Sequence, residues 1–188
     1  MLKALAPWAP WIVLLIISLG TPLGLGVGLV AAFVTVVVLA ALKLYRGILM
    51  WVTLIFFAGA FIAIFLLHNP WTLRYFAVIA NAMLAVAAWA GLLVGKPFTL
   101  GQAREQVDPS MWNHPLFLRV NQMIAAAWAA AFTVNAVVAW APTRQLLPIW
   151  SVIALTLAAL LGAVIFSSWY PAHIRRIAVA NDVGDGPD

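Results

Sequence analysis

The apolar residues of this sequence form six blocks, separated by short breaks that contain Pro, Asn, Gly or charged residues. A helix that crosses the hydrocarbon core of a bilayer needs about 20 apolar residues. Five of the blocks reach that length, and the first is shorter. The pattern therefore predicts an all-α integral membrane protein, a bundle of six transmembrane helices of which the first is short. The blocks cover residues 8–20, 22–42, 47–67, 72–95, 116–141 and 147–170.

The composition supports a membrane environment. Only 8% of the residues are charged, against about 25% in a soluble domain, and the mean hydropathy is +1.07. Most of the 10 tryptophans lie near block ends, where indole rings favour the membrane interface. We expect a single transmembrane domain over residues 1–188, with a cytoplasmic loop at 96–119 and a disordered tail at 178–188.

The basic residues predict the orientation of the chain. Six crossings place both termini on one side of the membrane, and only Arg74 and Arg144 then lie on the opposite side. Because cytoplasmic loops are enriched in Lys and Arg, both termini are expected to be cytoplasmic. The net charge of +5 then favours membrane lipids as partners, and we expect no nucleic-acid partner because the cations are not clustered. The cytoplasmic cations are Lys3, Lys43, Arg46, Lys96, Arg104, Arg119, Arg175 and Arg176.

Three blocks carry small residues at helical spacing. Such stripes let helices approach closely within a membrane, where lipid provides no hydrophobic force between them. We expect these stripes to be contact surfaces, within the bundle or between copies of the chain. They are Gly24, Gly28 and Ala32 in the second block, Ala87, Gly91 and Gly95 in the fourth, and the alanines at 125–127 and 129–131 in the fifth.

Polar residues within the fourth and fifth blocks are candidates for a functional role, because polar groups are costly in lipid. Asn81 follows Arg74 by seven residues, and Trp128 lies seven residues from both Asn121 and Asn135, so each set shares a helical face. The two faces would line a polar path. Alternatively, the arginine extends to the headgroups and the amides bond to neighbouring helices. No Asp, Glu or Lys lies within a block, which disfavours an ion-coupled transporter.

The cytoplasmic loop holds a second group of candidates. Thr99 and Gln102 have the spacing of a capping box, which predicts a short helix over 100–107. The Asp-Pro pair at 108–109 predicts a second capped turn, and the His-Pro pair at 114–115 predicts the start of the fifth crossing. The loop residues expected to contact a partner are Arg104, Glu105, Asp108, His114 and Arg119.

The run KPFTLGQAREQVDPSMWNHPLFLRVNQMI, residues 96–124, resembles a signature of small multi-pass bacterial membrane proteins of uncharacterised function. In that signature a Pro-Phe-Thr segment leads to Ala-Arg-Glu, followed by a Trp, a Pro-x-Phe and an Asn that opens a crossing. The resemblance implies a bacterial inner membrane and a binding role for this loop, and it implies no activity. The corresponding positions here are 97–99, 103–105, 112, 115–117 and 121.

The sequence contains no signature of catalysis or metal binding. It has no cysteine, no phosphate loop and no His-x-x-x-His pair, so we expect no catalytic residue, metal or cofactor. The favoured hypothesis is a non-catalytic accessory or scaffold subunit that packs against a membrane complex or against a second copy. Two alternatives stay open. One is a small uncoupled channel or permease, and the other is a lipid-directed membrane enzyme that uses Arg104, Glu105 or His114.

Overall fold

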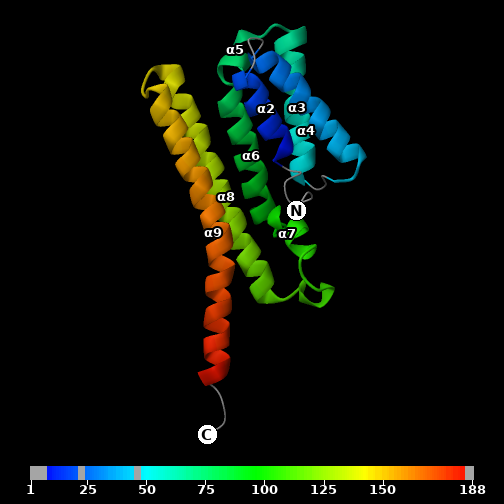
Figure 1. Cartoon of the computed structure of the whole chain (residues 1–188), viewed down its shortest axis with the longest axis vertical. Coiled ribbons are helices and arrows are strands. Elements are labelled where there is room, and N and C mark those ends of the chain that lie inside the picture. The colour runs from blue at the N-terminus through cyan, green and yellow to red at the C-terminus, as the bar shows by residue number, and fades with distance from the viewer. Residues whose placement is uncertain (1–7, 21–23, 45–47, 185–188) are drawn as a thin grey trace. The chain divides into compact units, whose positions relative to one another are not determined.

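A computed structural model describes residues 8–20, 24–44 and 48–184 of the chain (Figure 1). Every regular element within these ranges is helical, and no strand occurs among them. The predicted all-helical class is therefore confirmed. The helices long and apolar enough to cross a membrane are Gly24–Ala41, Phe76–Leu93, Pro115–Arg144 and Ile149–Ile177. Two further apolar helices, Ala9–Ser18 and Met50–Leu66, are shorter than this length.

The chain contains two compact units, Met1–Ala87 and Ala88–Asp188. Their boundary falls inside α6 (Phe76–Leu93), so this helix contributes residues to both. The predicted cytoplasmic cations Lys3 and Arg46 lie outside the described residues.

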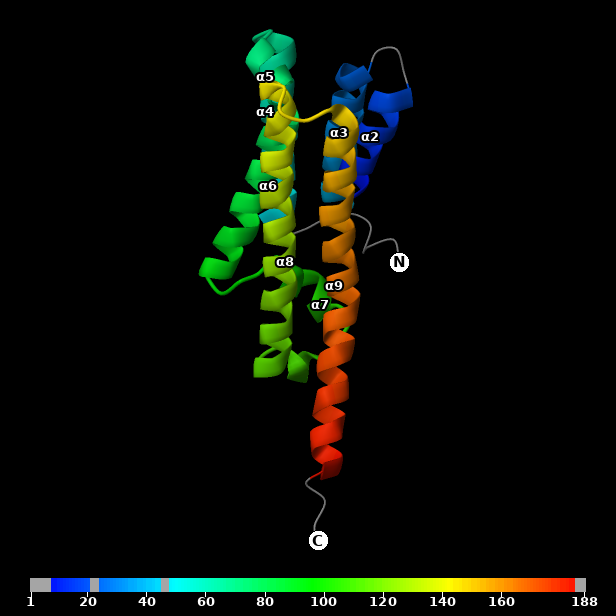
Figure 2. The same ribbon diagram turned by 90° about the vertical axis from the view of Figure 1, so that its left-hand side faces the viewer.

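The first unit is built around aromatic side chains of α4. α2 packs along α3 (Figure 2), and α3 also contacts α4. Phe56 and Phe57 are buried in the core, and the ring of Trp11 stacks on Phe56 at a centroid distance of 5.4 Å. Such ring pairs add about 0.5–1.5 kcal/mol to the burial of apolar area. The elements of this unit are α2 (Ala9–Gly20), α3 (Gly24–Ala41), α4 (Ile48–Phe61), the π-helix η1 (Ile62–Leu66), α5 (Pro70–Arg74) and the first part of α6.

The small-residue stripe of α3 is a contact surface within the chain. A Cβ atom at Gly28 would overlap Ser18 Oγ and would lie 3.0 Å from the carbonyl oxygen of Leu14, both in α2. Gly28 and Ala32 are buried, so the absence of side-chain bulk lets the two helices touch, as small residues do in membrane bundles. The contact predicted for this stripe is therefore made between α3 and α2.

The glycines of α6 have a different role from the one predicted. Gly95 has a φ of +69°, a conformation that only glycine adopts without strain. The amide of Lys96 donates to Gly91 O at 2.8 Å, and the amide of Gly95 donates to Leu92 O at 3.1 Å. This pattern is a Schellman motif, which ends a helix. Gly91 is buried, and a Cβ atom there would lie 3.1 Å from the carbonyl oxygen of Lys96, so Gly91 packs against the segment that follows α6 and not against another helix. Gly95, with open space around it, ends the helix instead of forming part of the predicted stripe of Ala87, Gly91 and Gly95.

The break between the third and fourth blocks contains a separate short helix. Asn69 caps α5 by accepting a hydrogen bond from the amide of Trp71 at 2.9 Å. α6 begins only at Phe76, so Arg74 belongs to the last turn of α5 and not to the long apolar helix. The predicted start of the fourth crossing at residue 72 is therefore four residues early.

The second unit is an antiparallel pair of long helices with a folded loop ahead of it. α8 and α9 lie side by side in opposite directions (Figures 1 and 2). Gln145, with a φ of +58°, lies in the turn between them. Besides the end of α6, the elements are α7 (Thr99–Arg104), the 3-10 helix η2 (Pro109–Met111), α8 (Pro115–Trp140), the 3-10 helix η3 (Ala141–Arg144) and α9 (Ile149–Gly184).

α9 is longer than its apolar block. It continues past Pro171 to Gly184, a length of 36 residues. A proline within a helix removes one backbone hydrogen bond without always ending the helix. The tail predicted to be disordered from residue 178 is therefore helical as far as Gly184, and residues 185–188 lie outside the described part of the chain.

Candidate functional site

Three polar side chains of α8 lie on one face of the helix. Asn121, Trp128 and Asn135 expose 4%, 8% and 1% of their surface. Their seven-residue spacing gives them a common direction, because two turns of an α-helix take about 7 residues. The predicted line of amide, indole and amide therefore exists, and all three side chains are buried.

Asn121 makes a side-chain hydrogen bond within its own helix and a backbone hydrogen bond to the preceding loop. Its Nδ2 donates to Phe117 O at 2.9 Å, while its backbone carbonyl accepts a hydrogen bond from Thr99 Oγ1 at 3.0 Å. The predicted capping box at Thr99 is thus wrong. Phe98 precedes α7 without a side-chain cap, and α7 ends at Arg104 rather than at residue 107. Thr99 fastens α7 to α8 instead of capping its own helix.

Trp128 joins the two long helices of the second unit. Its Nε1 donates to Ser167 Oγ of α9 at 3.0 Å, and Ser167 Oγ donates to Ala163 O at 2.7 Å. An interhelical hydrogen bond between polar side chains within a membrane contributes about 0.6 kcal/mol on average. The indole is therefore a structural connection, and it fixes the register of α8 against α9.

Asn135 differs from the other two residues. Neither its Nδ2 nor its Oδ1 has a hydrogen-bond partner among the described residues, although both atoms are buried. A buried polar group without a partner costs about 1–3 kcal/mol. Asn135 is therefore the candidate of the three whose polar atoms no contact within the described residues accounts for.

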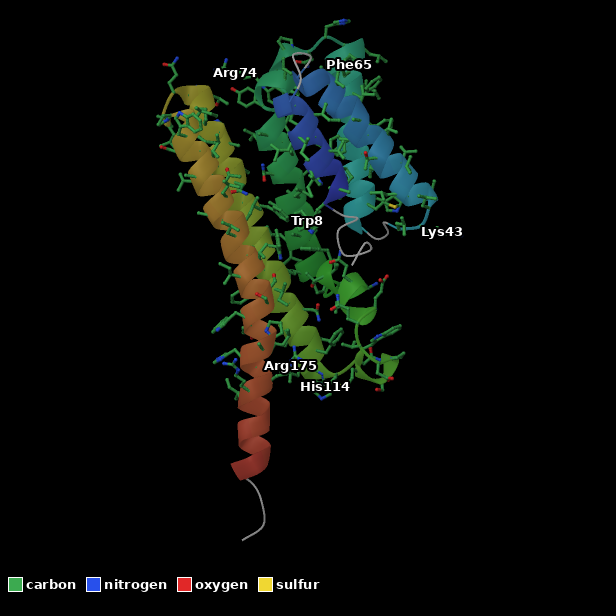
Figure 3. The ribbon with its side chains drawn as sticks, in the orientation of Figure 1. Trp8, Lys43, Phe65, Arg74, His114 and Arg175 are labelled. Carbon is green, nitrogen blue, oxygen red and sulfur yellow. The ribbon has the colours of Figure 1, made fainter. Side chains whose placement is uncertain are left out.

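The two candidates of the fourth block belong to the first unit. Nδ2 of Asn81 donates to Ala77 O of its own helix at 2.9 Å. Arg74 is exposed, with its guanidinium carbon 5.7 Å from the ring centroid of Tyr75. Figure 3 shows Arg74 at the same end of this unit as Phe65, and Trp8 and Lys43 at the other end. The polar path between the fourth and fifth blocks stays a prediction.

Arg104 is held in place by a tryptophan in the loop. The guanidinium carbon lies 5.4 Å from the ring centroid of Trp112, whose Nε1 donates to Arg104 O at 3.2 Å. Its Nε is buried and has no hydrogen-bond partner among the described residues. A cation over an indole ring adds about 0.5–1 kcal/mol at exposed sites. This pair therefore gives the loop a defined shape.

Two of the loop candidates act as helix caps. Asp108 Oδ1 accepts a hydrogen bond from the amide of Ser110 at 2.9 Å, and Nδ1 of His114 accepts one from the amide of Leu116 at 3.3 Å. The cap at Asp108 confirms the capped turn that the Asp-Pro pair predicted, and α8 begins at Pro115, where the His-Pro pair predicted the start of the fifth crossing. The backbone hydrogen bond from Ser110 lowers the pKa of Asp108. The other two loop candidates, Glu105 and Arg119, are exposed.

No cluster of three or more His, Cys, Asp or Glu residues that would hold a metal ion occurs within the described ranges. Comparison with known proteins gave no match to a family model, to a curated protein or to a solved structure. The functional interpretation of the chain therefore depends on its own geometry.

The partners of two tryptophans were not predicted from the sequence. Trp89 Nε1 donates to Thr133 Oγ1 at 3.1 Å, which connects the end of α6 to α8, and Trp128 finds Ser167 on α9. For Trp89 the available signal was Thr133, the lone Ser or Thr of the following block; for Trp128 the following block offers Ser151, Thr156, Ser167 and Ser168, and the sequence does not single out Ser167. An indole N–H needs an acceptor when it is buried.

Proposed function

We propose that this chain is a non-catalytic multi-pass protein of a bacterial inner membrane, an accessory or scaffold subunit that packs against another membrane protein or a second copy. The observation that carries this proposal is the surface of α9. Within the apolar stretch Ile149–Ile177, only 6% of the residues in the most apolar 18-residue segment are buried. A contiguous apolar surface of that size is a membrane or protein interaction site.

α8 covers only one side of α9. Ala163 is 4% exposed and Ser167 is bonded to Trp128, whereas Leu157, Val164 and Ile165 expose 53%, 50% and 63% of their surface. The polar groups on the covered side are occupied by contacts within the chain. What remains for another molecule is an apolar helical face, which suits lipid tails and a partner helix.

The proposed topology has six crossings with both termini in the cytoplasm. α4 and η1 follow each other directly and have 14 and 5 residues, and a crossing needs about 17–25 residues. α2 has only 12 residues and requires local thinning of the bilayer to cross. The distribution of Lys and Arg supports this orientation.

A photo-crosslinking experiment tests the subunit proposal. p-Benzoylphenylalanine at Leu157 is expected to form an adduct with a protein partner or with a second copy in native membranes. The same group at Phe132, which is 3% exposed, is the matched control and should form no intermolecular adduct. Adducts with lipid alone at Leu157, together with a monomeric mass in mild detergent, would contradict the subunit role.

The unpartnered amide of Asn135 favours a second candidate function, a small uncoupled channel or permease. A buried donor and acceptor without partners would bind a passing hydrogen-bonding solute at low desolvation cost. Osmotic swelling of proteoliposomes in urea or glycerol tests this function. The wild type should swell faster than Asn135→Leu, and swelling at the rate of protein-free liposomes would rule the function out for those solutes.

A further inference from the structure

The amide of Asn135 differs from the two other candidate amides in the contacts with its own backbone. Asn81 and Asn121 each donate from Nδ2 to the carbonyl oxygen four residues earlier in the same helix, both at 2.9 Å. The equivalent acceptor for Asn135 is the carbonyl oxygen of Ala131, and Nδ2 of Asn135 makes no hydrogen bond to it. Asn135 therefore does not use the acceptor that satisfies the other two amides.

The facing helix supplies no polar side chain at the same position. Trp128 of α8 bonds to Ser167 of α9, and the two helices lie side by side in opposite directions (Figures 1 and 2). Seven residues, about two helical turns, separate Asn135 from Trp128 and Leu160 from Ser167. The half-buried Leu160 therefore faces Asn135 as Ser167 faces Trp128, and a leucine side chain has no polar atom.

The exposed tryptophans of α9 place Leu160 and Asn135 relative to a bilayer. Trp150 and Trp169 expose 77% and 54% of their surface, and indole rings prefer the two interfaces. The two tryptophans are nineteen residues apart, which is about 28 Å along a helix and close to the hydrocarbon thickness of about 30 Å. Leu160 follows Trp150 by ten residues and precedes Trp169 by nine. Asn135 therefore lies near the midplane of the proposed membrane, where the surrounding hydrocarbon offers no hydrogen bond.

The chemistry of the amide defines the ligand that would satisfy it. Nδ2 needs an acceptor and Oδ1 needs a donor, so a matching ligand carries both groups close together, as a hydroxyl, a primary amide and water do. No Asp, Glu, Lys or Arg occurs in residues 120–143 or 149–174, so nothing compensates the charge of an ion at this depth and a neutral ligand is favoured. Because Asn135 exposes only 1% of its surface, the ligand must also be small.

We infer that Asn135 is a binding site, at the midplane of the membrane, for a small neutral molecule that carries both a donor and an acceptor. The molecule is water or a small solute with a hydroxyl or amide group. The inference deepens the channel candidate and rests on the proposed membrane insertion. Buried polar groups that the protein leaves unsatisfied are the usual partners of buried water, and transporters bind their substrates near the midplane. A ligand that exchanges leaves the amide unsatisfied whenever it departs, so a leucine at this position still removes an energetic cost.

The test measures contact between the wild-type amide and water. The full chain, with isotopically labelled nitrogen in Asn and Phe, is placed in phosphatidylcholine bilayers, and solid-state NMR records the transfer of proton magnetisation from water. Asn135→Leu identifies the Asn135 signal. The side-chain amide of Asn135 should receive magnetisation faster than the backbone amide of Phe132, which is 3% exposed and lies about one turn away. The transfer to Phe132 should fall in Asn135→Leu and stay unchanged in Asn121→Leu, the matched control.

Added solutes distinguish the two sources of the ligand. If a solute binds, urea or glycerol should shift the Asn135 signal to a saturating value and lower the transfer from water. If water is the ligand, the signal should keep its transfer from water and should not shift. Tetramethylurea has no N–H group to donate to Oδ1 of Asn135, so it is the matched control for urea and should cause no shift.

Two outcomes would overturn the inference. One is an Asn135 amide that receives no magnetisation from water and does not shift with either solute, and the other is an equal shift with urea and tetramethylurea. A chain that alkaline carbonate extracts from vesicles would contradict the membrane insertion itself. A chain that stays inserted, with an Asn135 amide that contacts neither water nor solute, would refute only the site.

Discussion

Replacement of Asn135 by leucine should make the folded chain more stable. Asn135 is 1% exposed, and both of its amide atoms lack partners among the described residues. Leucine has a similar branched shape and no polar atom, so the substitution removes the desolvation cost without opening a cavity. An unsatisfied buried group costs about 1–3 kcal/mol, which sets the expected gain in the free energy of unfolding.

Thermal unfolding in a mild detergent, followed by circular dichroism, measures this change. For a chain of this size, about 1 kcal/mol shifts the Tm by roughly 2–4 °C. Asn121→Leu is the matched control on the same face of α8, because the amide of Asn121 donates to Phe117 O. That variant should lose about 0.5–1.5 kcal/mol with its hydrogen bond.

A fall in the Tm of Asn135→Leu would refute this reasoning. It would show that the amide of Asn135 is hydrogen-bonded in the folded protein, as that of Asn121 is. If Asn135→Leu raised the Tm and also abolished solute flux, the amide of Asn135 would be a group that lowers stability but is needed for function. Such a compromise between stability and activity is common at functional sites.

Further predictions concern the ends of the helices and the orientation of the chain. Gly95→Ala should lower the free energy of unfolding by more than about 1 kcal/mol because of its positive φ, whereas Gly101→Ala, a helical position with open space around it, should be neutral or stabilising in the same melt. The pKa of Asp108, measured by carbon NMR of the carboxyl group, should lie below 3.8. Asp108 should therefore be ionised and its cap intact above the lowered pKa, and the cap should be lost as the pH falls through that pKa. A measured pKa of Asp108 at or above 3.8 would contradict the cap. Arg144→Cys and Arg176→Cys, in a chain without other cysteines, should react with impermeant maleimide from opposite sides of the membrane, and labelling from one side would disprove the six-crossing topology.

Local signals were sufficient to predict several ends of helices. The Asp-Pro pair predicted the cap at Asp108 and the His-Pro pair predicted the start of α8, because each of these features depends on backbone groups only one or two residues away. The capping box at Thr99 failed for the opposite reason. Its hydroxyl donates to the carbonyl of Asn121, twenty-two residues later, and no local spacing reveals a partner at that distance.

The glycines show a second limit of sequence patterns. Gly28 and Gly91 both lie in stripes of small residues, yet Gly28 packs against another helix whereas Gly91 accepts the hydrogen bond that ends its own helix. The spacing of the two stripes is identical, so it does not reveal that Gly28 lies against α2 whereas Gly91 lies against the segment that follows its own helix. The sequence also does not predict that the amide of Asn135 lacks a hydrogen-bond partner among the described residues, because this depends on the positions of polar groups on other helices.

The length of α9 has a consequence beyond the bilayer. Its 36 residues extend for about 54 Å, although the hydrocarbon core takes up only about 30 Å. In the proposed orientation the excess projects into the cytoplasm as a stalk of roughly 20 Å. Such a stalk holds Gly184 clear of the lipid surface, within reach of water-soluble macromolecules. Deleting two turns would draw that point inward by about 11 Å while leaving the spanning segment whole.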